Sequence, residues 1–138
     1  MADVLTAEEA ARVAEFRAAL RQFLRTTERN ARRAGLTPQR YLLLLMIKGA
    51  ADRSEKSTVT ELAHRLQLAQ STVTELVRRA EESGLVERER SPADGRIAHL
   101  RLTDEGERRL AESFTNNESE RRALREAFRH LEGQVLQP

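Results

Sequence analysis

The chain has 138 residues, which is typical of one compact unit, and its formal net charge is only +2. Zero cysteines exclude disulfides, thiolate metal sites and thiol redox switches. No run approaches the roughly 18 apolar residues that span a bilayer, and no basic segment followed by an apolar run marks a secretory signal. We therefore expect a cytoplasmic protein without membrane contact.

Two helices are predicted in the first third of the chain. A capping box of Thr6 and Glu9 opens the first helix, and Gly35 ends it. Thr37 and Pro38 open the second, which contains an uninterrupted apolar run over residues 41–47. A strand is the alternative for this run, but leucine outnumbers β-branched residues, which favours a buried central helix.

The middle of the chain predicts two short helices joined by a tight turn. Residues 51–57 are polar and indicate a loop, after which Thr58 and Glu61 form a second capping box. Residues 67–70 form the turn. The next helix has apolar residues at i, i+3, i+4 and i+7, and Gly84 ends it; these residues are Val73, Leu76, Val77 and Ala80.

A β-hairpin and two further helices are predicted in the last part of the chain. Residues 85–90 and 97–103 have strand patterns, and residues 91–95 have the composition of a turn. A helix then follows Thr103, with Leu110, Ala111 and Phe114 as its apolar side. Residues 116–117 suggest a break before the last helix.

Both terminal helices carry narrow apolar stripes with coiled-coil spacing. The stripes consist of Val13, Phe16, Leu20, Phe23, Leu124, Phe128, Leu131 and Val135. We expect residues 1–34 and 104–138 to be dimerisation helices of a homodimer, interwoven with a DNA-binding domain over residues 36–103. The alternative is that one subunit buries both stripes by folding the helices on each other.

The order of three helices and a hairpin predicts a mainly α winged helix-turn-helix. With its apolar side buried, the fourth helix presents Ser71, Thr74, Glu75 and Arg78 to solvent. Such a helix fits the major groove of duplex DNA, with Arg78 and Arg79 placed to reach bases and phosphates. In the hairpin, Arg88, Arg90 and Arg96 concentrate positive charge around the turn, and Arg96 suits a narrow minor groove. We expect Asp94 to shape that turn or orient Arg96 through a salt bridge.

The segment over residues 58–103 resembles the multiple antibiotic resistance regulator (MarR) family. The resemblance rests on LAHRLQLAQSTVTELVRRAEESGLVERE, on the Asp94-Gly95-Arg96 wing signature, and on the Leu-Arg-Leu-Thr that follows it. It implies a dimeric transcriptional regulator without cofactor or metal, usually a repressor on a pseudo-palindromic operator, released by a small, often aromatic, ligand. The DNA-contacting positions that it implies are Gln70, Ser71, Thr72, Thr74, Arg78 and Arg96.

Two residues depart from the family pattern. Ala69 stands where a serine often caps the recognition helix, although Thr72 and Glu75 offer a capping box one turn later. Glu75 stands where a basic residue often reaches DNA. Its carboxylate can accept from a cytosine amino group, pair with Arg78 or Arg79, or weaken binding, and we expect the intrahelical pairing.

Two other function classes compete with a DNA-binding regulator. An enzyme needs a nucleophile with its base, clustered carboxylates or metal ligands, whereas His64, His99 and His130 lie in separate elements without ligand spacing. A protein-interaction module that keeps the winged fold without binding DNA is the stronger alternative. Glu75 favours that module, whereas three wing arginines argue against it.

Overall fold

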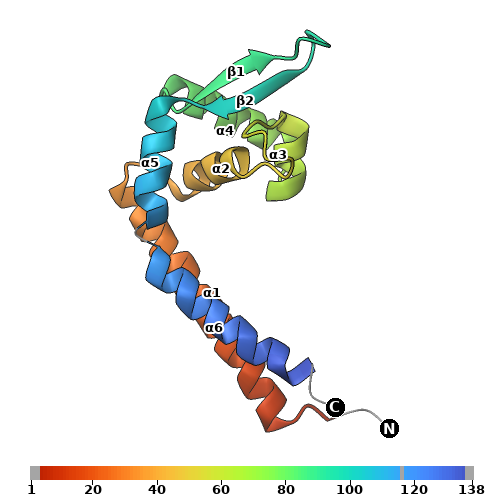
Figure 1. Cartoon of the computed structure of the whole chain (residues 1–138), viewed down its shortest axis with the longest axis vertical. Helices are drawn as coiled ribbons and strands as arrows, with labels where there is room; N and C mark the ends of the chain where they lie inside the picture. Colours follow the sequence, from red (N-terminus) through yellow and green to blue (C-terminus); the bar gives the residue numbers. More distant parts are fainter. Residues whose placement is uncertain (1–3, 116, 136–138) are drawn as a thin grey trace. The chain divides into compact units, whose positions relative to one another are not determined.

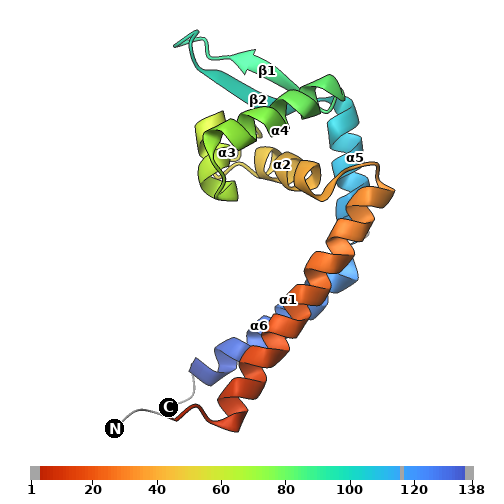
Figure 2. The same cartoon turned by 180° about the vertical axis from the view of Figure 1, so that it is seen from behind.

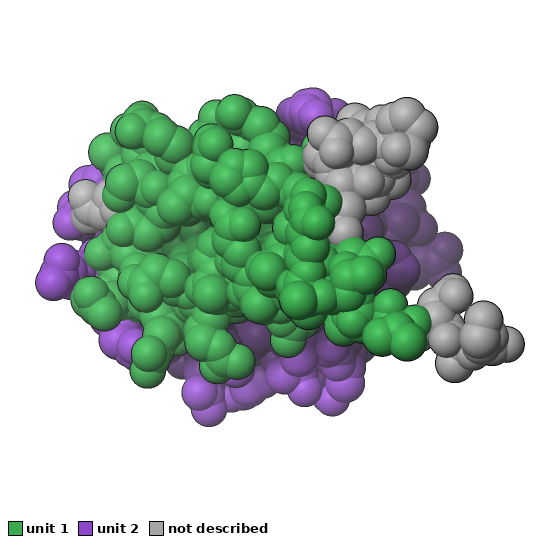
Figure 3. Space-filling model, turned by 90° about the horizontal axis from the view of Figure 1, so that it is seen from below, with its two compact units in different colours: residues 1–30, 114–138 green, residues 31–113 purple. Residues whose placement is uncertain are grey.

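The structure is a computed structural model that describes residues 4–115 and 117–135, with the side chains of residues 133–135 left out. The chain divides into two compact units, residues 1–30 with 114–138 and residues 31–113 (Figure 3). We call them unit 1 and unit 2. The predicted mainly helical fold with a β-hairpin is confirmed. The elements are α1 (Ala7–Arg33), α2 (Pro38–Lys48), α3 (Val59–Leu66), α4 (Gln70–Glu82), β1 (Val86–Arg90), β2 (Ala98–Leu102), α5 (Asp104–Thr115) and α6 (Glu118–Val135).

Unit 1 is built from α1 and α6, which run side by side (Figures 1 and 2). The rings of Phe16 and Phe128 meet with their centroids 6.0 Å apart and tilted by 56°. The carboxylate of Glu15 lies 2.9 Å from the Nδ1 atom of His130. The two predicted stripes therefore contact each other within one chain, as the single-subunit alternative expects.

This packing leaves much apolar surface of unit 1 open to solvent. Val13, Leu24 and Phe128 remain 48%, 47% and 45% exposed. Val13, Leu20 and Leu24 lie on one side of α1, turned by about 40° to 100° from Phe16 and Phe23. One partner helix therefore does not cover the apolar surface of α1. The side chain of Val135 lies outside the described residues.

The predicted apolar side of α5 is partly wrong. Leu110 is buried, but Ala111 is exposed and Phe114 is 45% exposed. The buried side of α5 instead consists of Gly106, Leu110 and Ser113, because Gly106 brings its backbone against the carbonyl of Leu85. That approach turns Phe114 outward, where the guanidinium of Arg121 lies 3.8 Å from its ring centroid.

The core of unit 2 surrounds α2, which confirms the predicted central helix. Thr37 caps the helix, because its side chain accepts a hydrogen bond from the backbone N–H of Arg40. Leu43, Leu44 and Ile47 are fully buried. α2 contacts α3, α4 and β2, so the hairpin and both short helices pack around this apolar helix.

The hairpin pairs β1 with β2 in antiparallel register, from Val86 opposite Leu102 to Arg90 opposite Ala98. Ser57 forms an isolated bridge with Leu100 and donates and accepts one backbone hydrogen bond there. The strands are shorter than the predicted runs, since residues 85, 97 and 103 lie outside them. The bridge ties the loop before α3 to the base of the hairpin.

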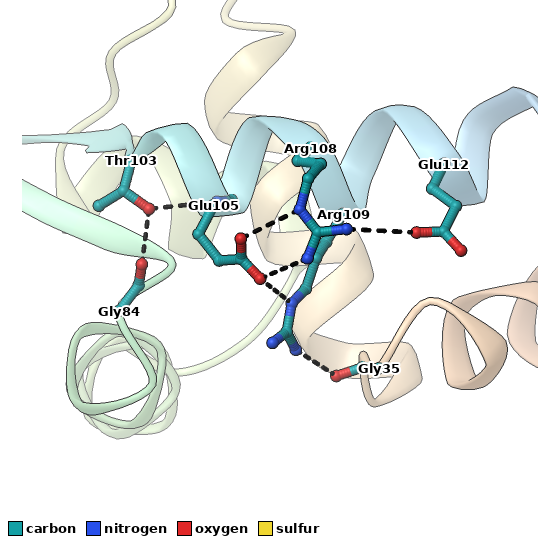
Figure 4. A network of polar contacts seen from close by, with 8 residues as sticks. Gly35, Gly84, Thr103, Glu105, Arg108, Arg109 and Glu112 are labelled. Atoms are coloured by element: carbon teal, nitrogen blue, oxygen red, sulfur yellow. Dashed lines mark hydrogen bonds and ion pairs between the residues drawn. The ribbon is translucent and has the colours of Figure 1, made fainter.

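A polar network joins the end of α4 to the start of α5 (Figure 4). Gly84 has a left-handed φ of 73° and its carbonyl accepts from the hydroxyl of Thr103 at 2.6 Å. The same hydroxyl accepts from the backbone N–H of Gly106. Arg109 donates to the carbonyl of Gly35 at 3.1 Å and to Glu105 at 2.7 Å. These contacts hold the first turns of α5 against the end of α4 and the loop after α1, within unit 2.

Replacing Gly106 by alanine tests the close approach of α5 to the strand start. A Cβ atom there would lie 2.2 Å from the carbonyl oxygen of Leu85, so backbone must move. We expect Gly106→Ala to lower the free energy of unfolding by about 1–3 kcal/mol, measured by urea denaturation. Gly95→Ala is the control, since a Cβ there meets nothing within 4 Å. Equal stability of both variants would contradict the packing.

Candidate nucleic-acid interface

The α3–turn–α4 unit positions one exposed helix face. Both hydrogen bonds of the predicted capping box are present between Thr58 and Glu61. Gln67 takes a left-handed conformation with φ 55° and ψ 47°, which ends α3 and turns the chain. The four predicted apolar residues of α4 are all buried: Val73, Leu76, Val77 and Ala80. Their burial fixes the opposite side of α4 to solvent.

The α4 residues that the sequence predicts to contact DNA lie on the solvent side of this helix. They are Gln70, Ser71, Thr72, Thr74, Arg78 and Arg79, and all are exposed. The helix begins at Gln70, so a start at Thr72 is wrong. Ala69 makes no side-chain cap, as its residue type predicts. Gln70 is held by a hydrogen bond of 3.2 Å from its amide nitrogen to the hydroxyl of Thr60.

Glu75 forms the predicted intrahelical ion pairs. Arg78 donates to both carboxylate oxygens of Glu75, with a distance of 2.9 Å from its Nε atom to Oε2. Arg79 donates to the same carboxylate at 3.1 Å. Arg78 also pairs with Glu82. Both arginines of this helix face are therefore engaged by carboxylates one turn away.

These contacts set the charge state of the face. Hydrogen bonds from Arg78 are the largest cause that lowers the pKa of Glu75 to about 2, with Arg79 adding to the effect. The pKa of Arg78 is raised chiefly by its hydrogen bonds to Glu75. Glu75 is therefore ionised at neutral pH.

The three wing arginines have different surroundings. Arg88 pairs with Glu81 at 3.1 Å, and Arg90 donates to the carbonyl of Gly95 at 2.7 Å. Arg96 is 93% exposed at the turn of the hairpin. Both its backbone N–H and its Nε donate to one carboxylate oxygen of Asp94, at 3.0 and 3.3 Å. Asp94 thus shapes the turn and orients Arg96, as predicted.

Several contacts between charged residues near this surface were not predicted from the sequence. Lys56 pairs with Glu89 at 2.9 Å, and Arg101 pairs with Glu87 at 3.1 Å. Glu82 lies four residues after Arg78 on α4, so helical spacing alone would have predicted their contact. The contacts of Lys56 and Arg101 join different segments, so local spacing does not reveal them.

Among the residues described, no group of three histidine, aspartate or glutamate side chains is arranged to hold a metal ion. His64 is exposed on α3, His99 is half-buried on β2, and His130 pairs with Glu15. None of the described helices is long and apolar enough for a membrane span.

The sequence and fold match known regulators. The model of the MarR family matches residues 34–97. YsmB of Bacillus subtilis (strain 168), an uncharacterized HTH-type transcriptional regulator, is 34% identical over 93 residues, which are 67% of this chain and 61% of YsmB. The chain belongs to the MarR family. It spans about three fifths of the length of YsmB.

Two solved structures illustrate the similarity in fold. The transcriptional regulator Tm0710 from Thermotoga maritima is 30% identical, with a TM-score of 0.61 over 75% of this chain and 73% of Tm0710. Reduced AbfR bound to DNA is 30% identical, with a TM-score of 0.56 over 72% of this chain and 66% of AbfR. The predicted winged helix-turn-helix of the MarR family is confirmed.

Supplying the missing cap of α4 should stabilise the MarR-family fold. Ala69 has the extended backbone of an N-cap residue but no acceptor for the first N–H groups of the helix. We expect Ala69→Ser to raise the free energy of unfolding by about 0.5–1 kcal/mol, measured by urea denaturation. Thr58→Ala, which removes an existing cap, should lower it by a similar amount. A destabilised Ala69→Ser chain would contradict the observed helix start.

The ion pair of Glu75 can be titrated directly by NMR of its side-chain carboxyl carbon. Because its folded-state pKa of about 2 lies below the usual 4.5, the pair stabilises the folded chain above about pH 4.5 and is lost as pH falls toward 2. Arg78→Ala should raise the pKa of Glu75 toward 4.5, and Arg79→Ala should raise it less. Titration near 4.5 in the unmodified chain would show that the pair does not form.

Proposed function

We propose that this MarR-family chain is a transcriptional regulator that binds duplex DNA as a homodimer, with α4 in the major groove and the hairpin in the minor groove. The observation that carries the proposal is the pairing of a polar exposed face on α4 with a fully exposed arginine at the hairpin turn. Both belong to unit 2, whose core holds the two elements together. The DNA-bound structure of the relative AbfR supports duplex DNA as the partner.

The exposed face of α4 suits the major groove. A B-DNA major groove is about 12 Å wide and admits one helix. Ser71 and Thr74 have short hydroxyl side chains, which let the helix approach base edges closely. Gln70 and Thr72 flank them in the first turn, where recognition helices make their base contacts. Arg78 and Arg79 follow one turn later, within reach of bases and phosphates.

The hairpin offers one arginine to the minor groove. Arg88 and Arg90 are already bound to Glu81 and to the Gly95 carbonyl, so we assign them to shaping the wing and to peripheral phosphate contacts. Arg96 is the residue that extends from the turn. A narrow minor groove has an enhanced negative potential that attracts such a side chain.

The open apolar surface of unit 1 supports a homodimer. Val13 and Leu24 are about half exposed on the side of α1 that α6 does not cover. Isolated exposed apolar side chains are common, but a stripe on a long helix marks an interface. A second copy that covers this stripe would present two α4 helices, and a two-fold operator would match them.

Repression and release by a ligand complete the proposal. Repression needs only occupancy of the DNA, which the proposed binding mode supplies without further contacts. For a ligand, unit 1 has an open concavity of about 490 Å³ whose surface is almost entirely apolar. These features suit a small aromatic ligand. The lining residues are Phe16, Phe23, Arg121, Leu124, Arg125 and Phe128. Such a regulator would work in the cytoplasm, where bacterial DNA is.

A protein-interaction module that does not bind DNA is the second candidate. The observation that favours it is the acidic character of α4, in which three carboxylates outnumber two guanidiniums: Glu75, Glu81 and Glu82 against Arg78 and Arg79. Such a module would not need an arginine as exposed as Arg96. The two candidates differ in whether the chain selects a DNA sequence.

Selection of bound genomic fragments, followed by sequencing and titration of the best site at several salt concentrations, tests the proposal. A regulator should enrich a two-fold site whose half-sites lie about one helical turn apart. The logarithm of the binding constant should fall with the logarithm of salt by about 0.9 per neutralised phosphate. Absence of any enriched site would favour the interaction module.

Removing Arg96 should weaken operator binding without affecting folding, because the side chain is 93% exposed and pairs with Asp94 next to it on the same turn. We expect Arg96→Ala to reduce operator affinity by about 5- to 50-fold, which corresponds to roughly 1–2 kcal/mol, measured by fluorescence anisotropy. Arg122→Ala on α6 removes the same charge elsewhere and should have little effect. Equal operator affinities of the two variants would show that Arg96 of the wing does not contact the DNA.

A charge on the open stripe of α1 should break the dimer while sparing the subunit. Val13 is 48% exposed, so Val13→Glu costs little in a single chain but buries a carboxylate between two chains. We expect a shift from dimer to monomer in sedimentation velocity, with operator affinity reduced at least tenfold. Ala18→Glu places the same charge on the opposite, exposed side of α1 and should leave the dimer intact. A monomeric unmodified chain would contradict the dimer.

A further inference from the structure

The carboxylate of Glu75 stands between two arginines on the proposed reading face. Its two oxygens take both the Nε and Nη2 donors of Arg78, and one of them also takes the Nε of Arg79. Glu82 binds the remaining Nη1 group of Arg78. The guanidinium that is best placed for DNA is thus already held on two sides by carboxylates.

This arrangement penalises contacts with DNA phosphates. An arginine contributes to non-specific binding by neutralising a phosphate and releasing counterions. Arg78 is already neutralised by Glu75 and Glu82, and bringing a phosphate close to either carboxylate adds repulsion between like charges. Arg78 therefore adds little to the affinity for DNA that the chain contacts only through phosphates.

A guanine–cytosine pair offers more to the same two side chains. In the major groove guanine presents two acceptors, O6 and N7, which suit a bidentate arginine, and cytosine presents an amino donor, which suits a carboxylate. Glu75 and Arg78 lie three residues apart on one helix face, so they meet neighbouring base edges together. Both charges are then satisfied by one base pair or by two adjacent ones.

We infer that Glu75 is a specificity-determining residue, which withholds Arg78 from phosphates and, together with Arg78, selects a guanine–cytosine pair in each half-site. This inference rests on the proposed function. Glu75 stands where the family often has a basic residue. On this inference, Glu75 improves discrimination between DNA sequences and lowers the total affinity for DNA. Glu75 acts partly through Arg78 and is to that extent a positioning residue.

The experiment compares the unmodified chain with Glu75→Gln, a change that keeps the side-chain shape and removes its charge. Each is titrated against the selected operator, against operators with each half-site base pair replaced, and against random-sequence DNA. With Glu75→Gln we expect affinity for random DNA to rise, and its salt slope to steepen by about 0.9 for each released guanidinium. The preference at one guanine–cytosine position per half-site should fall by about 5- to 150-fold.

Control variants separate this role from a general effect of charge or folding. Glu112→Gln removes the same charge on α5, where the carboxylate lies 3.8 Å from Arg108, and should change neither the slope nor the preference. Glu82→Gln loosens only one contact of Arg78 and should act in the same direction as Glu75→Gln but more weakly. In an Arg78→Ala background, Glu75→Gln should lose most of its effect on random DNA. Thermal unfolding of each variant checks that the fold is kept.

The outcomes distinguish the inference from the proposed function. An enriched operator whose base preferences and salt slope are the same for Glu75→Gln and the unmodified chain overturns the inference alone. An effect of Glu75→Gln that persists fully in the Arg78→Ala background overturns the positioning role. Absence of any enriched site for the unmodified chain overturns the proposed function and the inference with it.

Discussion

The burial of one side of α4 against the core of unit 2 determines what the chain presents to a partner. Val73, Val77 and Ala80 are fully buried, and α4 packs against α2, α3 and β1. Rotating the helix to expose other side chains would remove these groups from the core at about 1.5–3 kcal/mol for each large one. The packing of its buried side therefore fixes which side of α4 faces solvent.

The same core sets the position of the hairpin relative to α4. β1 follows α4 after the left-handed Gly84, and Thr103 at the end of β2 binds back to the carbonyl of that glycine. Gly106 then allows α5 to approach Leu85 more closely than any other residue type would permit. The two proposed DNA-contacting elements, α4 and the hairpin, are thus connected through Gly84, Thr103 and Gly106. Arg96 lies at the far end of the hairpin from these three positions.

The electrostatics of this surface are more balanced than its arginine content indicates. Arg78, Arg79, Arg88 and Arg96 each have a carboxylate partner, and of these four the Arg96 side chain is the most exposed, at 93%. Ion pairs on an exposed helix contribute little to stability. Their consequence here concerns binding, because a paired arginine exchanges one partner for another and gains less from a phosphate than a free one.

Local signals in the sequence predicted most of the fold. Capping boxes at Thr6 and Thr58 and the glycines at 35 and 84 marked helix ends, because these depend on residues three or four apart. The outward turn of Phe114 and the contact of Lys56 with Glu89 were not predictable, because each depends on segments brought together only by tertiary packing. For the site, the exposed face of α4 followed from helical periodicity. The contacts of Arg88 with Glu81 on α4 and of Arg90 with the Gly95 carbonyl required the structure.

Chemical interference mapping of the operator tests the central claim most directly, because it reports which groove each element occupies. Methylation at guanine N7 probes the major groove, and methylation at adenine N3 probes the minor groove. The account predicts two blocks of N7 interference about one helical turn apart on one face of the duplex, flanked by N3 interference that disappears with Arg96→Ala. Interference confined to one groove, or N3 interference unchanged by Arg96→Ala, would contradict it.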